Sequence, residues 1–297
     1  MLEKPLLTVG LAAALAAALT AGTGTVPAIA QRSALVFTAI PDEDETRLVE
    51  RFTQYAKYFE SKLGVPVKYL PVKSYPAAVT AFINNQVQFA WFGGLTGVQA
   101  RLAVPNSEAI AQGAEDVAFK SYFIANASTG LKRAKDFPKE IQGKTFTFGA
   151  RGSTSGRLFP EFFIREALGD KAPEAVFSRV GYSGDHSRTI QLVQSGAFEV
   201  GVVNHLIWDS EVKSGKVDTK AVSVIWETPT YPDYHWVARG DIDKTYGAGF
   251  KDKLKATILA IDDPKLLAIF DRTKFIPAKN EDYKAIEEVG KLTGLIN

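Results

Sequence analysis

The stretch KTFTFGARGSTSGRLFPEFFIREAL, residues 144–168, decides how this chain is expected to fold. KTFTFG predicts a strand and FPEFFIREAL predicts a helix, and between them glycines flank Ser153, Thr154 and Ser155. One hydroxyl at the start of a helix acts as a cap, because it accepts a hydrogen bond from an unpaired backbone N–H. Three hydroxyls with flanking glycines also suit an anion, which the same N–H groups and the helix dipole would hold. We favour anion binding over capping alone.

The loop does not match two familiar catalytic patterns. A nucleophile elbow has serine in the middle of G-x-S-x-G, whereas the middle residue of GSTSG is Thr154. The stretch also has no Lys-Ser or Lys-Thr in the pattern of a phosphate-binding P-loop. The catalytic alternative that remains is a secreted hydrolase, which would use Ser153 or Ser155 with Asp185 and His186 from the turn GYSGDHSRT. We rank it below a protein that binds without chemistry.

Strands and helices alternate on both sides of this loop. ALVFTAI (34–40) predicts a strand, and the segment 41–64 predicts a helix that enters at Pro41 and is closed by Gly64. The apolar spacing in this helix predicts one buried face, made of Leu48, Phe52, Tyr55 and Phe59. Further strands are expected near 65–72, 87–93, 119–126, 144–149, 177–183, 199–204 and on both sides of a turn at 229–233. This alternation favours an α/β fold with mostly parallel sheets.

Two connections are expected to divide the chain into two α/β lobes. One is an apolar segment near 118–120, and the other is the proline-rich turn at 229–233, after which the chain returns to the first lobe. We therefore assign residues 31–118 plus 233–297 to one lobe and residues 119–232 to the other. Two lobes joined by two short connections favour a hinged clamp with a ligand cleft between them.

The composition narrows the possible functions. The 297 residues are 46% hydrophobic and 23% charged, as in a soluble globular protein, and the formal net charge of +2 is too small to indicate nucleic acid as a partner. The chain has no cysteine, which rules out disulfides, thiolate metal sites and cysteine catalysis. The spacing of the three histidines indicates no metal site. We predict no metal and no cofactor, and we expect a monomer.

The first 30 residues differ from the rest of the chain. Lys4 precedes an uncharged run rich in alanine and leucine, and Ala28-Ile29-Ala30 has the small-x-small pattern of a signal-peptidase site. The alternative is a membrane anchor, but the strongly apolar part, 6–19, is shorter than the ~20 residues that a spanning helix needs. We predict a signal peptide at residues 1–30, so that the mature protein lies outside the cytoplasm.

Four more residues lie at turns where a ligand could be held. Trp91 ends an expected strand, where ligands of open α/β sheets sit, although a buried tryptophan is as often plain core. Tyr75 lies at a turn from strand to helix, and its hydroxyl would meet either a ligand or water. His186 would donate to an anion at a helix start or simply begin the helix. Asp233 repels an anion unless a proton is shared between them, so it is either irrelevant or a detector of a protonated oxyanion.

Several segments together carry a resemblance to a known family. AIPDEDETRL, FAWFGGLTGVQAR, FKSYFIAN, FTFGARGSTSGRL, GYSGDHSRTIQLVQSG and TPTYPDYHW resemble the periplasmic phosphonate- and phosphite-binding proteins of ABC importers. The resemblance implies the two-lobed type II periplasmic-binding-protein fold, a periplasmic location, a membrane permease as partner and no enzymatic activity. It also implies ligand contacts by Tyr75, Ser153, Thr154, Ser155, His186 and Asp233.

Two departures from the family point to a small ligand. Where aminoalkylphosphonate binders use an acid to hold the amine, this chain has Ile207, and a tyrosine of those binders is replaced by Phe119. Both changes remove polar groups from the far end of the pocket. With Trp91 as a wall, the pocket would suit phosphite first and methylphosphonate or another phosphonate next.

Overall fold

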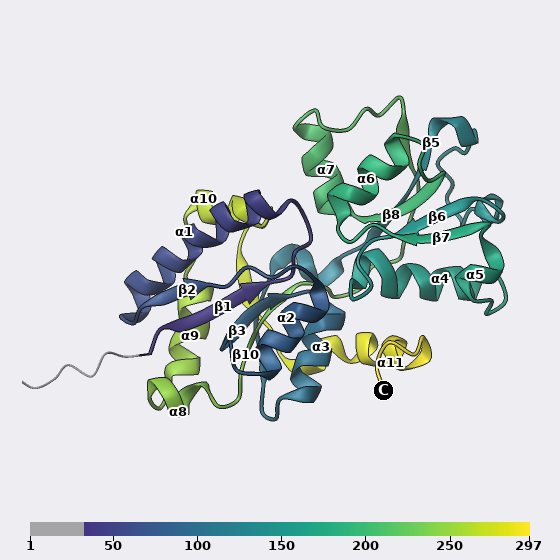
Figure 1. Ribbon diagram of the computed structural model, residues 1–297. Coiled ribbons are helices and arrows are strands. Elements are labelled where there is room, and N and C mark those ends of the chain that lie inside the picture. Colours follow the sequence, from purple (N-terminus) through teal and green to yellow (C-terminus); the bar gives the residue numbers. More distant parts are fainter. Residues whose placement is uncertain (1–32) are drawn as a thin grey trace, which may run out of the picture. The chain divides into compact units, whose positions relative to one another are not determined.

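The computed structural model describes residues 33–297, which form an α/β structure with two separate sheets (Figure 1). The predicted signal peptide lies outside the described residues. Within the described part, no helix has both the length and the apolar character needed to cross a membrane. We call the six-stranded sheet with its helices lobe 1, and the five-stranded sheet with its helices lobe 2.

Lobe 1 is built on strands from both ends of the described chain. The strand order is β11-β4-β10-β3-β1-β2, and β1 pairs in parallel with β2 and β3. The strands are β1 (Leu35–Ala39), β2 (Val67–Tyr69), β3 (Phe89–Phe92), β4 (Glu108–Gly113), β10 (His235–Ala238) and β11 (Phe275–Pro277).

Lobe 2 is built on a continuous part of the chain. Its strand order is β7-β6-β8-β5-β9. The strands are β5 (Ser121–Asn126), β6 (Thr145–Phe148), β7 (Arg179–Tyr182), β8 (Val200–Asn204) and β9 (Val222–Glu227).

The expectation of mostly parallel sheets is wrong, because both sheets are mixed. In lobe 1, β10 runs antiparallel between β3 and β4, and β11 runs antiparallel to β4. In lobe 2, β5 is antiparallel to both β8 and β9. The cause is the path of the chain: it leaves lobe 1 after β4, and β10 re-enters that sheet from the opposite direction.

The helices cover the sheets with amphipathic faces. The first one, α1, buries the four residues predicted from their spacing, and all are at most 4% exposed. It begins at Glu45, later than the expected start near Pro41, with Asp44 as its cap through the Arg47 N–H. The helices are α1 (Glu45–Leu63), α2 (Tyr75–Ile83), α3 (Gly94–Ala103), α4 (Phe159–Ala167), α5 (Pro173–Val176), α6 (His186–Gln194), α7 (His205–Lys213), α8 (Ile242–Tyr246), α9 (Phe250–Leu259), α10 (Pro264–Ile269) and α11 (Lys284–Leu292).

Two adjacent segments connect the lobes. The chain passes from β4 to β5 through 114–120 and returns from β9 to β10 through 228–234. Phe119 and Tyr231 pair across these segments through reciprocal backbone hydrogen bonds of 2.8 and 2.9 Å. Beside them, the Arg272 guanidinium forms a buried ion pair with Asp116. Such an ion pair is costly to break, because either charge alone would be left in the interior.

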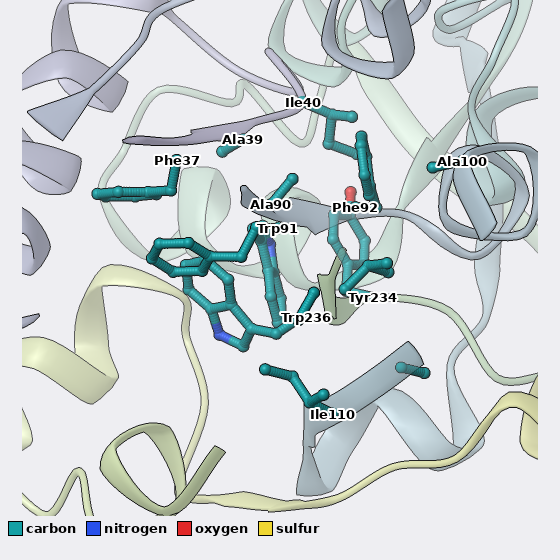
Figure 2. Close-up of a cluster of buried hydrophobic side chains, with 14 of the residues drawn as sticks. Phe37, Ala39, Ile40, Ala90, Trp91, Phe92, Ala100, Ile110, Tyr234 and Trp236 are labelled. Carbon is teal, nitrogen blue, oxygen red and sulfur yellow. The ribbon is translucent and has the colours of Figure 1, made fainter. Parts of the chain in front are cut away.

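The core of lobe 1 is aromatic. Trp91 and Trp236 lie side by side on neighbouring strands, with ring centroids 5.4 Å apart (Figure 2). Tyr234, from the connecting segment 228–234, stacks on Trp91. Burial of such large rings is a strong hydrophobic contribution to stability. The core therefore fixes the carboxyl end of β3 and the start of α3.

Candidate functional site

The hydroxyl loop after β6 divides its three side chains among three roles. Ser153 is the cap: its Oγ accepts a 2.9 Å hydrogen bond from the Gly156 N–H. Thr154 reaches lobe 1, where its Oγ1 accepts a 3.0 Å hydrogen bond from the Leu95 N–H. Ser155 Oγ is buried and has no hydrogen-bond partner among residues 33–297. Capping thus explains one of the three hydroxyls.

Asp233 faces this loop from the connecting segment 228–234. Its Oδ1 accepts a 2.9 Å hydrogen bond from the Gly94 N–H at the start of α3, whereas its buried Oδ2 is unpartnered in the described chain. Burial raises the pKa of Asp233 from 3.8 to about 7, although the Gly94 N–H partly offsets the shift. A Cβ at Gly93 would lie 3.3 Å from both Asp233 Oδ1 and Thr154 Oγ1, so glycine leaves room for this close approach.

His186 begins α6 and is fully buried. Its Nδ1 accepts a 3.2 Å hydrogen bond from the Asn204 N–H, and burial lowers its pKa to about 3. A neutral imidazole whose Nδ1 is an acceptor carries its proton on Nε2. His186 Nε2 is therefore a donor, and it has no partner in the described part of the chain. A Cβ at Gly156 would lie 3.0 Å from the imidazole Cε1, which places the ring against the hydroxyl loop.

Tyr75 begins α2, and its buried hydroxyl is also without a partner in residues 33–297. Burial raises its pKa well above 10, so the hydroxyl keeps its proton as a donor. A Cβ at Gly152 would lie 3.1 Å from Tyr75 Cβ, so this tyrosine packs on the other end of the hydroxyl loop.

The arrangement suits a protonated oxyanion. The unpartnered atoms are the donors Tyr75 Oη, Ser155 Oγ and His186 Nε2, together with Asp233 Oδ2. The three donors lie at or next to the starts of helices, where backbone N–H groups and the helix dipole favour negative charge, and Asp233 contacts the start of α3 through the Gly94 N–H. Arg272 has only a minor effect on the pKa of Asp233, because its guanidinium is paired with Asp116. Neutral donors therefore dominate this site.

The structure buries Trp91 in the core of lobe 1. Its indole packs on Tyr234, Trp236 and Phe270 in the core of lobe 1, with centroids 4.7 to 5.7 Å apart. It also lines a neighbouring pocket with Asn204 and Ile207 of lobe 2. No contact recorded in the described chain joins the indole to the unpartnered atoms, so a wall formed by Trp91 stays a prediction.

The residues of the hydrolase alternative do not form a triad. The Asp185 carboxylate caps α6 by accepting a 2.6 Å hydrogen bond from the Arg188 N–H. His186 Nδ1, which a triad acid would have to orient, faces the Asn204 N–H instead. The geometry of Ser-His-Asp catalysis is therefore missing from these residues.

Sequence reasoning missed some groups that complete the site. The N–H groups of Gly94 and Leu95 join lobe 1 to Asp233 and Thr154. Asp42 was assigned to the first helix, but its carbonyl accepts a 3.0 Å hydrogen bond from the His186 N–H. Their place in the sequence could have indicated these groups. Gly94 and Asp42 follow the carboxyl ends of strands, where ligands of α/β sheets are bound.

The fold and this site define a class of protein. Two α/β lobes joined by two segments, with buried neutral donors at helix starts, are the features of a solute-binding protein. The chain belongs to the family of periplasmic substrate-binding proteins of phosphonate ABC transporters, whose family pattern matches residues 37–283. It is thus a binding component of an importer and not an enzyme.

Known relatives agree in sequence and in structure. The chain is 41% identical, over 89% of its length and 91% of the relative, to a probable ABC transporter phosphite-binding protein, PhnD1, of Prochlorococcus marinus. The structure of PhnD1 in complex with methylphosphonate matches with a TM-score of 0.84 and 40% identity, covering 89% of this chain and 99% of that chain. A phosphonates-binding periplasmic protein of Escherichia coli is 26% identical, over 75% of this chain and 65% of that protein.

Proposed function

We propose that this protein captures phosphite between its two lobes and delivers it to the membrane permease of an ABC importer. Methylphosphonate or another small phosphonate is the next candidate. The names of PhnD1 and of its methylphosphonate complex support a reduced phosphorus oxyanion as the ligand class. The observation that carries the proposal is the set of buried unpartnered atoms, three donors and one carboxyl oxygen.

Six of the seven predicted residues have a role in the proposed complex, and Trp91 stays a predicted wall to be tested. Tyr75, Ser155 and His186 donate hydrogen bonds to the oxygens on phosphorus, together with N–H groups at the hydroxyl loop. Asp233 accepts the proton of a singly protonated ligand. Ser153 and Thr154 hold the loop in shape, the first as its cap and the second by its bond to lobe 1.

The proposed selectivity follows from hydrogen-bond chemistry. Sulfate carries no proton at neutral pH, so the proton shared with it would have to come from Asp233 itself, and sulfate should not bind once Asp233 is ionised. Phosphate carries an extra P–OH in place of P–H, which would either clash or remain unpaired inside a dry site. Ile207 itself offers no acceptor for the amine of an aminoalkylphosphonate, but Asp42, Glu43 and Asp271 line the same neighbouring pocket, so discrimination against that amine has to be measured.

The remaining parts of the proposal concern the whole protein. We propose lobe boundaries at residues 31–118 plus 233–297 and at 119–232, which the two connections between the sheets support. We also propose a signal peptide cleaved after Ala30, release into the periplasm, and a monomer that does not bind nucleic acid. The small net charge of +2 supports the last point.

A thermal-shift screen tests the ligand. Phosphite, methylphosphonate, 2-aminoethylphosphonate, phosphate and sulfate are added separately to the purified mature protein. A ligand at 1,000 times its Kd should stabilise the folded state by about 4 kcal/mol. We expect the largest shift with phosphite. Phosphate is an essential comparison, because a phosphate-import protein of Mycolicibacterium smegmatis is 23% identical to this chain. A larger shift with phosphate or 2-aminoethylphosphonate would overturn the proposed ligand.

A further inference from the structure

Four buried or half-buried residues form a ring of contacts beside the site. The Asp42 carbonyl accepts from the His186 N–H at 3.0 Å, and His186 Nδ1 accepts from the Asn204 N–H at 3.2 Å. The Asn204 side chain then donates through Nδ2 to the Tyr234 hydroxyl at 3.1 Å. The Tyr234 hydroxyl faces the Asp42 carboxyl, which closes the ring.

The ring crosses from one lobe to the other twice. Asp42 follows β1 in lobe 1, whereas His186 and Asn204 lie at the start of α6 and the end of β8 in lobe 2. Tyr234 belongs to the segment that connects the lobes. The bond between the His186 N–H and the Asp42 carbonyl exists only when the two lobes meet. Closure of the lobes and completion of the ring are therefore the same event.

The ring also shares atoms with the ligand site. His186 uses Nδ1 in the ring, which leaves the proton on Nε2, the atom proposed to donate to the ligand. Tyr234 is the neighbour of Asp233 in the chain, and its ring is held by stacking on Trp91. An intact ring thus holds both His186 and Asp233 in place without contributing a ligand contact through Tyr234 or Asp42.

We infer that Asp42, His186, Asn204 and Tyr234 form a latch that keeps the two lobes closed around the ligand, with Asp42 and Tyr234 as positioning residues. This inference rests on the proposed function for the identity of the ligand, but not for the geometry of closure. Loss of the Tyr234 hydroxyl removes the hydrogen bond from Asn204 Nδ2 and the group that faces the Asp42 carboxyl, while the phenyl ring remains to fill the core. Hydrogen bonds of this kind correspond to about a 5- to 30-fold change in an equilibrium constant.

The test compares Tyr234→Phe with Tyr55→Phe. Tyr55 is the matched control, because its buried hydroxyl donates to the Leu266 carbonyl at 2.8 Å within lobe 1. Kd and koff are measured for phosphite and for methylphosphonate. The distance between the lobes is measured with and without ligand by pulsed electron resonance on a Lys57→Cys, Lys216→Cys double variant. Both lysines are exposed, and the chain has no native cysteine that would also be labelled.

The latch predicts that Tyr234→Phe raises koff about 5- to 30-fold and shifts the liganded distance distribution towards the open form. Tyr55→Phe should match the wild type in both measurements. If Tyr234→Phe does not fold, Asp42→Ala replaces it, since that variant loses the carboxyl but keeps the carbonyl bonded to His186. Wild-type koff and distances in the variant would overturn the latch. A wild-type protein that binds neither ligand would instead overturn the proposed function.

Discussion

Replacement of Asp233 by asparagine should change how both stability and binding depend on pH. Burial raises the pKa of Asp233 from 3.8 in the unfolded chain to about 7 in the folded protein. The folded state therefore holds a proton that the unfolded state releases, and stability present below pH 3.8 is lost as the pH rises through 7. The difference of about 3 pKa units corresponds to about 4 kcal/mol. Without ligand, Asp233→Asn should be more stable than the wild type at pH 8 and gain nothing at pH 4.

The affinity for the oxyanion should depend on the same proton of Asp233. In the proposed complex, Asp233 and the oxyanion share one proton, whichever of them carries it. Above pH 7 and above the second ionisation of the ligand, neither partner carries that proton, so the complex must take up one proton when it forms. Wild-type affinity should then fall up to tenfold for each further pH unit, or about 1.4 kcal/mol. The asparagine can donate from its amide to the dianion, so its affinity should level off.

Calorimetry with phosphite from pH 6 to pH 9, in two buffers of different ionisation enthalpy, counts the protons taken up. The matched control is Asp263→Asn, because Asp263 caps α10 through the Lys265 N–H and asparagine can cap equally well. The control should keep the wild-type slope. A flat wild-type profile, or no proton uptake at pH 9, would refute the assignment of Asp233 as the proton acceptor.

The remaining predictions separate binding from stability. Ser155→Ala should weaken phosphite binding by about 1.5–3 kcal/mol, with little change in the urea midpoint of the unliganded protein, because Ser155 Oγ has no partner in the described chain. Ser153→Ala should lower the free energy of unfolding by about 1 kcal/mol, because the Ser153 Oγ caps the Gly156 N–H. Equal unfolding midpoints for the two variants would contradict the assignment of Ser155 to binding and Ser153 to stability. Trp91→Ala should lower the free energy of unfolding by about 3–5 kcal/mol, since the indole is 3% exposed in an aromatic core. If the indole also contacts the ligand, Trp91→Phe, which keeps an aromatic ring in the core, should reduce the ratio of the affinity for phosphite to that for methylphosphonate.

Much of the fold was readable from local pattern, and the failures have physical causes. Strands and helices with strong apolar periodicity were placed correctly, but β4 and β11 were missed. The β4 sequence, EAIAQG, contains alanine, glycine and glutamate, which are depleted in strands. The β11 sequence, FIP, is three residues long and ends in a proline, which edge strands tolerate. The antiparallel insertion of β10 depends on the return path of the chain, which no local pattern encodes.

The site was readable only in part for a similar reason. Residue type and position predicted that the hydroxyl loop binds an anion, but not which hydroxyl acts as the cap. The assignment of the His186 proton to Nε2 depends on the N–H of Asn204, 18 residues away in the chain. The bond between Asp42 and His186 joins residues of different lobes. Such pairings arise only in the tertiary structure. In the sequence, an acidic residue such as Asp42 near a helix start resembles an ordinary helix-capping residue.

The absence of a basic side chain among the proposed ligand contacts has a consequence for selectivity. An arginine or lysine attracts every small anion, because its charge is insensitive to where the ligand carries protons. Neutral hydroxyls and a neutral imidazole instead depend on the direction of each hydrogen bond, and Asp233, once ionised, penalises any ligand without a proton to share. A site made in this way gives up some general attraction and gains discrimination between oxyanions of equal charge. For the proposed phosphite importer this matters, because sulfate and phosphate are close in shape to the ligand, and it makes the proton count at Asp233 the decisive measurement.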